Sequence, residues 1–104
     1  MSKWPPGVPI PPTDDETNAL DALIRAAIAN SIVSGFHLEF GEDSNGERAV
    51  WIYLRVDSKQ KWSKQDEAEV YRVTSTIRNG IIQSKIGYWP YVDVEEVELD
   101  GSVH

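Results

Sequence analysis

The residues suited to acid–base or metal chemistry are few in this chain. Histidine occurs as His37 and as the terminal His104, and cysteine is absent, which removes thiolate nucleophiles, disulfides and cysteine-ligated metals. His37 and Glu39 would share one face of a strand, yet a metal site needs three or four converging ligands. We therefore predict no metal and no cofactor, and we interpret His37 as a solvated strand residue.

A second concentration of possible ligands lies near the end of the chain. It is an acidic run: Asp93, Glu95, Glu96, Glu98 and Asp100. Carboxylates bind hard cations such as calcium, but this run lacks the ligand spacing and the glycine of a calcium-binding loop. We interpret it as a charged strand edge that discourages pairing with other molecules.

Nucleophilic catalysis is not indicated by the serines. Ser58 and Ser63 lie at the ends of predicted elements, and Ser63 is accounted for as a helix cap. A serine triad would need His37 as its base, and no local pattern indicates one. The chain contains no Walker loop and no G-x-G-x-x-G sequence. We predict a protein that is not an enzyme and has no catalytic residue, while carboxylate pairs for glycoside chemistry depend on spatial separation and stay open.

Aromatic residues are the most informative chemical feature of the chain. In the predicted strand 49–57, aliphatic residues occupy one face, and Trp51 and Tyr53 occupy the other. Trp89 and Tyr91 are spaced to share a face at the start of the last strand. If the last strand adjoins strand 49–57, Tyr91 joins Trp51 and Tyr53 in one aromatic patch. Large rings on the wet face of a sheet need a cover or a partner, so these four are the candidate binding residues.

Four uses of this aromatic surface are open at the level of sequence. Aromatic sheets bind single-stranded RNA in some domains. Aromatic residues are also enriched at protein–protein interfaces, so the surface suits a dimer. A proline-rich segment of the same chain could stack on the rings. Finally, aromatic rings beside carboxylates form shallow sites for a cation or an amine.

Net charge discriminates among these uses. Ten basic residues face seventeen acidic ones, giving a formal net charge of −7. Nucleic-acid binding depends on neutralising phosphates with Lys and Arg, so this balance predicts no nucleic-acid partner and repulsion from anionic lipid. It favours cationic ligands or a basic protein partner, although an acidic surface also serves solubility alone.

Location follows from the absence of hydrophobic targeting signals. No apolar run approaches the roughly 20 residues that span a bilayer. The first residues, MSKWPP, have no apolar signal-peptide core. We therefore predict a cytoplasmic protein with no membrane partner.

Residues 1–12 are predicted to form a proline-rich extended arm, called the proline arm below. Five prolines within residues 2–12 exclude a helix or a central strand, because proline fixes φ and lacks the N–H. The arm also carries Trp4, Val8 and Ile10, which a solvated linker would not need. We expect it to pack across its own domain or a neighbouring subunit; recognition by an aromatic-grooved module of another protein is the alternative.

Residues 13–99 are predicted to form a single α+β domain, followed by a frayed tail at 100–104. A capping box of Thr13 and Glu16 opens a first helix, whose apolar spacing predicts the span 14–34 with Gly35 as its stop. Alternation predicts strand 36–40, a polar loop 41–47 with an Asn45-Gly46 turn, and strand 49–57 antiparallel to it.

The second half of the domain follows the same signals. Ser63 and Asp66 cap a second helix that runs to about Ser84 through Asn79-Gly80. The last strand is predicted at about 91–99. Its apolar phase slips between Val94 and Val97, which indicates a bulge near Glu95-Glu96.

The resulting order, α-β-β-α-β, predicts a two-layer sandwich with both helices on one face of a three-stranded mixed sheet. This arrangement resembles a ferredoxin-like fold that lacks its first strand. In topology it is also similar to the small cytoplasmic domain of cation-efflux transporters. That domain binds metal through histidines, which do not occur at matching places here, so the resemblance implies no site residue.

Taken together, the residues predict a small, acidic, non-catalytic binding domain that associates through its aromatic sheet face. The expected partners are a second copy, forming a homodimer, a basic protein, or both. Size and charge are those of an antitoxin or an immunity-type inhibitor of a toxic nuclease. The alternative is a small-molecule binding protein with an aromatic and acidic pocket for a cationic ligand.

Overall fold

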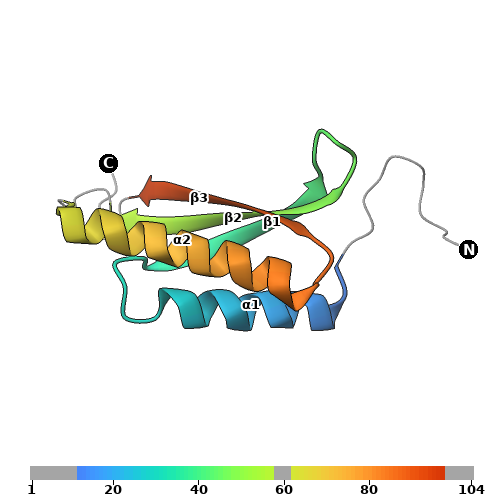
Figure 1. The fold of residues 1–104 in the computed structure, drawn as a ribbon, viewed down its shortest axis with the longest axis horizontal. Helices are drawn as coiled ribbons and strands as arrows, with labels where there is room; N and C mark the ends of the chain where they lie inside the picture. The colour runs from blue at the N-terminus through green and yellow to red at the C-terminus, as the bar shows by residue number, and fades with distance from the viewer. Residues whose placement is uncertain (1–11, 58–61, 98–104) are drawn as a thin grey trace, which may run out of the picture.

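Two helices lie under one face of a three-stranded sheet (Figure 1). The computed structural model describes residues 12–57 and 62–97. The elements follow the predicted order: α1 (Asp14–Ile28), β1 (Gly35–Glu42), β2 (Arg48–Asp57), α2 (Lys64–Ser84) and β3 (Trp89–Val97). The two-layer α+β architecture is therefore confirmed. Except for Pro12, the predicted proline arm lies outside the described residues, as does the predicted tail.

Both helices begin where their side chains predict. The Thr13 hydroxyl accepts a hydrogen bond from the Glu16 amide at 3.1 Å, and the Glu16 carboxylate accepts one from the Thr13 amide at 2.9 Å. Ser63 and Asp66 make the same reciprocal pair before α2, at 3.1 and 3.0 Å. Each pair satisfies two backbone N–H groups that the first helical turn leaves unbonded.

The end predicted for the first helix is wrong. The helix ends at Ile28 rather than at residue 34, and Asn30 adopts a left-handed φ of 61°. Asn tolerates this conformation, so it breaks the helix before Gly35 can. Apolar spacing continues past the break because the loop itself buries Val33, which is 5% exposed. The Glu69 carboxylate fixes this loop by accepting a hydrogen bond from the Ile32 amide at 2.9 Å.

Gly80 lies inside α2, as predicted, and its absent side chain has a structural reason. A Cβ at this position would lie 3.0 Å from a methyl carbon of Leu23 on α1. The glycine therefore lets the two helices approach closely, which offsets its intrinsic cost in a helix. The helix ends at Ser84, and the left-handed backbone of Lys85 caps it.

The sheet has the order β1-β2-β3, with β1 antiparallel and β3 parallel to β2. Strand β1 includes Gly41 and Glu42, which the sequence assigned to the loop, and β3 begins at Trp89 rather than Tyr91. The bulge predicted near Glu95-Glu96 is absent, because β3 pairs residue for residue with β2 through Val97. Val97, at the end of the strand, points to the side of the sheet opposite the helices, as the other odd-numbered residues of β3 do.

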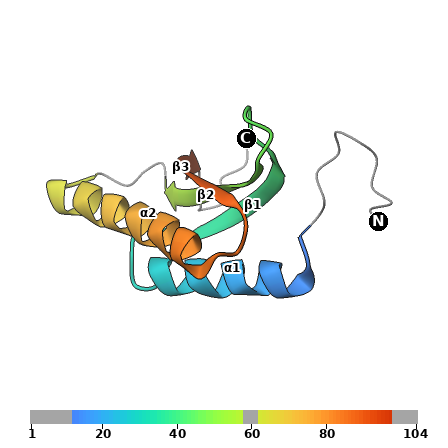
Figure 2. The ribbon, with the colours of Figure 1, turned by 45° about the vertical axis from the view of Figure 1, so that its right-hand side comes forward.

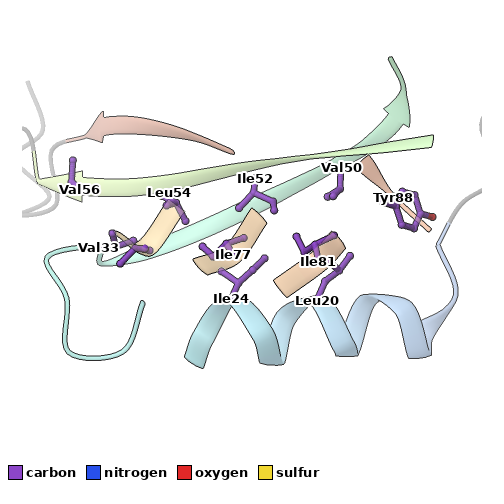
Figure 3. Packing of buried hydrophobic residues seen from close by; sticks show 11 residues of the cluster. Leu20, Ile24, Val33, Val50, Ile52, Leu54, Val56, Ile77, Ile81 and Tyr88 are labelled. Carbon is purple, nitrogen blue, oxygen red and sulfur yellow. The ribbon is translucent and has the colours of Figure 1, made fainter. Parts of the chain in front are cut away.

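The core lies between the sheet and the helices (Figure 3). Alternate residues of β2 point towards the helices, and all four are fully buried: Val50, Ile52, Leu54 and Val56. They meet Leu20 and Ile24 of α1, and Ile77 and Ile81 of α2 (Figure 3). No helix in the described part of the chain has the length and apolar character that a membrane crossing requires.

Candidate functional site

The candidate site is the open face of the sheet, defined as the side opposite the helices and formed by the odd-numbered strand residues. In both views of the ribbon, α1 and α2 lie on the same side of the sheet, and no described element covers the other side (Figures 1 and 2). Strand pairing arranges the open face in rows that cross the sheet. One row is Glu39–Trp51–Tyr91, and the next is His37–Tyr53–Asp93.

Trp51 and Tyr91 form the centre of the open face. Their rings stack with centroids 5.5 Å apart and planes 14° apart. The Trp51 indole also lies over Gly41 of β1, where a Cβ would be 3.3 Å from a ring carbon. Ala49 on the same face is 0% exposed, so larger neighbouring side chains cover it. The rings therefore lie along the sheet as a thin aromatic layer rather than projecting separately.

A second stack joins all three strands. The His37 ring lies 4.7 Å from the Tyr53 ring, at an interplanar angle of 21°. His37 Nδ1 is also 3.5 Å from a carboxylate oxygen of Glu95. Because His37 is on β1 and Glu95 on β3, this contact passes over β2 and partly covers Tyr53. The prediction of His37 as a solvated strand residue is therefore incomplete, because Tyr53 and Glu95 contact its ring.

The loop between β1 and β2 extends the open face with an acidic group. Tyr91 donates a hydrogen bond from its hydroxyl to Asp43 at 3.0 Å. The second oxygen of the Asp43 carboxylate accepts bonds from the Asn45 and Glu47 amides, at 2.9 and 3.0 Å. The bond from the Glu47 amide is the main cause that lowers the pKa of Asp43. The same Asp43 contact is the main cause that raises the pKa of Tyr91.

Carboxylates also surround the other tyrosine of the face. Desolvation raises the pKa of Tyr53, and the negative charges of Glu39, Asp93 and Glu95 raise it further. Arg55, in the row Gly35–Arg55–Glu95, is the single arginine or lysine among the odd-numbered residues of the described strands. The open face therefore presents aromatic rings in a negative field, which favours a positively charged ligand.

Trp89 marks one end of the open face and borders two adjoining hollows, which we call the Trp89 groove. The larger hollow, of about 460 Å³, is lined by Ile81, Ile82 and Lys85 of α2 together with Arg48. The smaller, of about 220 Å³, is lined by Asp43, Asn45 and Tyr91. Glu47 and Trp89 line both hollows, so the two adjoin at these side chains. The larger hollow is mainly apolar and also has two basic side chains, Arg48 and Lys85, whereas the smaller hollow is acidic.

Arg48 lines the larger hollow and is held there by contacts with Tyr88 and Glu16. Its guanidinium carbon lies 4.2 Å from the centre of the Tyr88 ring, and it donates a hydrogen bond to the Tyr88 hydroxyl. It also lies 3.5 Å from the Glu16 carboxylate of α1. Tyr88 is 6% exposed and packs in the core, and its remaining surface lines the larger hollow.

The structure brings the four predicted residues onto one side of the sheet. It stacks Trp51 on Tyr91, covers part of Tyr53 with His37, and leaves Trp89 at the edge, where 47% of its surface is exposed. Sequence reasoning missed Asp43, because an aspartate in a turn predicts only local backbone bonds. Among the described residues, no three His, Cys, Asp or Glu side chains gather as metal ligands.

No protein-family model matches this chain, and no curated protein or solved structure matches it either.

Proposed function

We propose that this protein is a small, acidic, non-catalytic binding domain whose open face recognises a basic segment of a protein partner. The observation that carries the proposal is the Trp51–Tyr91 stack, which lies on a face that no described element covers and is bordered by carboxylates. Aromatic residues at such a position supply large contact area with little loss of side-chain entropy.

The chemistry of the face favours arginine-containing segments. A guanidinium stacks on aromatic rings and binds carboxylates in a bidentate manner, whereas an ammonium group does neither as well. Trp51 supplies the aromatic ring, Glu39 lies beside it in the same row, and Asp93 lies on β3 in the next row. One arginine of a partner could therefore use both types of contact at once.

Charge also favours a basic partner over a second copy of this chain. A face-to-face homodimer would bring Glu39, Asp93 and Glu95 of one copy towards the same acidic surface of the other. Like charges at an interface are costly, and Arg55 offers little compensation. The homodimer expected from sequence is therefore the weaker form of the proposal, and light scattering on the purified chain tests it.

The test uses an oligoarginine peptide as the probe and follows the backbone amide signals of β2 by NMR, which every variant retains. Replacing Trp51 with serine should weaken binding by roughly tenfold or more, as expected for a central aromatic anchor. The matched control is Tyr71→Ser on α2, since Tyr71 is 74% exposed and lies in the helix layer. Its loss should leave binding unchanged.

A second pair of variants tests the electrostatic part. Glu39→Gln on the open face should weaken binding and flatten its salt dependence, and Glu67→Gln on α2 should do neither. Equal effects of Trp51→Ser and Tyr71→Ser would contradict the proposal. So would equally tight binding of an oligoglutamate peptide.

One observation favours a second function, the binding of a small cationic molecule. The smaller hollow places Asp43 and Glu47 beside Trp89 and Tyr91, which is the composition of an aromatic amine site. Saturable quenching of tryptophan fluorescence by tetramethylammonium, lost in Trp89→Ala and retained in Trp51→Ser, would support this function. Absence of saturation would remove it.

A further inference from the structure

We propose that the Trp89 groove is the docking site of the chain's own proline arm, bound within the same molecule in a polyproline II conformation. The Trp89 groove adjoins the centre of the open face and shares Tyr91 with it. The proposal does not rest on the partner contact of Trp51. Three observations carry it: the chemistry of the groove, the spacing of residues in the arm, and the point at which the arm joins the fold.

The groove has the composition of a polyproline-binding surface. Such surfaces present exposed aromatic rings that contact prolines, with acidic side chains that select a basic residue next to them. Trp89 and Tyr91 are 47% and 36% exposed, and Asp43 and Glu47 lie beside them. Tyr71, the other strongly exposed aromatic, lies on α2 and lines neither hollow.

The arm has the spacing that such a groove requires. Lys3, Pro6, Pro9 and Pro12 recur at intervals of three residues. A polyproline II helix has three residues per turn, so these four lie along one edge. Trp4 and Ile10 lie along a second edge for the same reason. One basic residue, a row of prolines and two apolar side chains can therefore face the groove together.

The arm joins the fold beside the groove. Pro12 directly precedes the cap of α1, and Glu16 in the first turn lies 3.5 Å from Arg48, which lines the larger hollow. Polyproline II extends about 3.1 Å per residue, so the steps from Pro12 to Lys3 span roughly 28 Å. That length is ample for two adjoining hollows.

The apolar and basic residues of the arm follow one another in the same order as the apolar and acidic hollows of the groove. Ile10, close to the attachment, would meet Ile81 and Ile82 in the larger hollow. Lys3, at the far end, would reach Asp43 and Glu47 in the smaller hollow. The reverse placement is disfavoured, because it would bring Lys3 against the cations of the larger hollow.

Docking within one molecule needs little intrinsic affinity. A short connection gives an effective concentration in the millimolar range, so weak contacts suffice to keep the arm bound. A bound arm would cover Trp89 and Tyr91 and so compete with any ligand that uses these rings. The arm would thus act as an internal competitor at one end of the open face.

The absence of cysteine from the chain permits a direct test. A nitroxide label attached through Ser2→Cys in the full-length protein broadens NMR signals of nearby nuclei. We expect a several-fold loss of intensity for the Trp89 indole and the Gly87 amide. A label attached through Gln65→Cys, at the opposite end of α2, should leave both signals intact (Figure 1).

Variants of the arm test the register without touching the described core. Lys3→Glu and the double variant Pro6→Ala/Pro9→Ala should restore the intensity of the Trp89 signal. The matched control is Pro5→Ala/Pro11→Ala, which changes two prolines on a different edge and should retain the loss. Equal restoration by both double variants would overturn the polyproline register.

Two further outcomes would overturn the proposal. The first is an unchanged Trp89 signal in the presence of the Ser2 label. The second is a loss seen only when isotope-labelled protein without nitroxide is mixed with nitroxide-labelled protein, which would mean docking between copies. Neither outcome affects the oligoarginine test of the open face, so the two proposals fail separately.

Discussion

The two faces of strand β2 differ in composition, burial and role. Towards the helices, aliphatic side chains such as Ile52 and Leu54 are fully buried and pack on both helices. Towards the open face, Trp51 and Tyr53 alternate with them and are only half-buried, among carboxylates. One strand thus supplies both the core and the candidate binding surface, because successive side chains point to opposite sides.

This difference separates stability from recognition. Burying a large aliphatic side chain contributes about 1.5–3 kcal/mol, and the core face of β2 contains four of them. A stacked aromatic pair adds about 0.5–1.5 kcal/mol beyond its buried area. Substitutions on the open face can therefore change binding while the fold survives, and three predictions test that separation.

The largest expected effect comes from neighbouring residues on opposite faces. Ile52→Ala should lower the free energy of unfolding by about 2–5 kcal/mol, because it leaves a cavity in the core. Tyr53→Ala removes the stack with His37 and some buried area, and it should cost less than Ile52→Ala because Tyr53 is only half-buried. Urea denaturation of both variants measures the difference, and similar losses would mean that the open face also stabilises the fold.

Two glycines provide an intermediate test. At Gly80, an added methyl group would press on Leu23 inside the helix layer, so Gly80→Ala should lose about 1 kcal/mol despite its better helix propensity. At Gly41, the added group meets the Trp51 ring at 3.3 Å, and this ring can tilt away from the sheet. Gly41→Ala should therefore leave the unfolding free energy nearly unchanged and shift the indole signal of Trp51.

The double variant Gly80→Ala/Leu23→Ala is the control for this pair. If contact with Leu23 causes the loss, the combined cost should be smaller than the sum of the two single costs. A stabilising Gly80→Ala would show that the helices separate freely and would contradict the close packing inferred here.

The smallest effect concerns the Tyr91–Asp43 hydrogen bond and its pH dependence. The pKa of Asp43 is lowered from 3.8, so its contribution to stability is present above pH 3.8 and is lost as pH falls through the folded-state pKa. The pKa of Tyr91 is raised from 10.0, so its contribution is present below pH 10.0 and is lost as pH rises through the folded-state pKa.

Tyr91→Phe separates the two contributions. The pKa of Asp43 should rise only slightly in this variant, because the Glu47 amide and not Tyr91 is the largest cause of its lowering. An NMR titration of the Asp43 carboxyl group measures the change. A return of this pKa to 3.8 would show that the tyrosine, and not the turn, controls the carboxylate.

Sequence reasoning predicted the elements whose signals are local. The reciprocal caps of Thr13 and Ser63 depend on residues three positions away, and both form as predicted. It failed where a distant contact intervened: the first helix ends early because Asn30 turns the chain and Glu69 of α2 holds the loop that follows. No pattern near Asn30 encodes that contact.

The sequence by itself determined the two helix starts, the α-β-β-α-β order and the separation of Trp51 from Ile52. These depend on hydrogen bonds within one turn and on the two-residue period of a strand. Tertiary structure alone decided that β3 lies parallel beside β2 and thereby stacks Tyr91 on Trp51. It also placed Asp43 within hydrogen-bond distance of the Tyr91 hydroxyl and set two hollows side by side at Trp89. The reason is that these contacts join residues far apart in the chain, whose meeting depends on how the whole core packs.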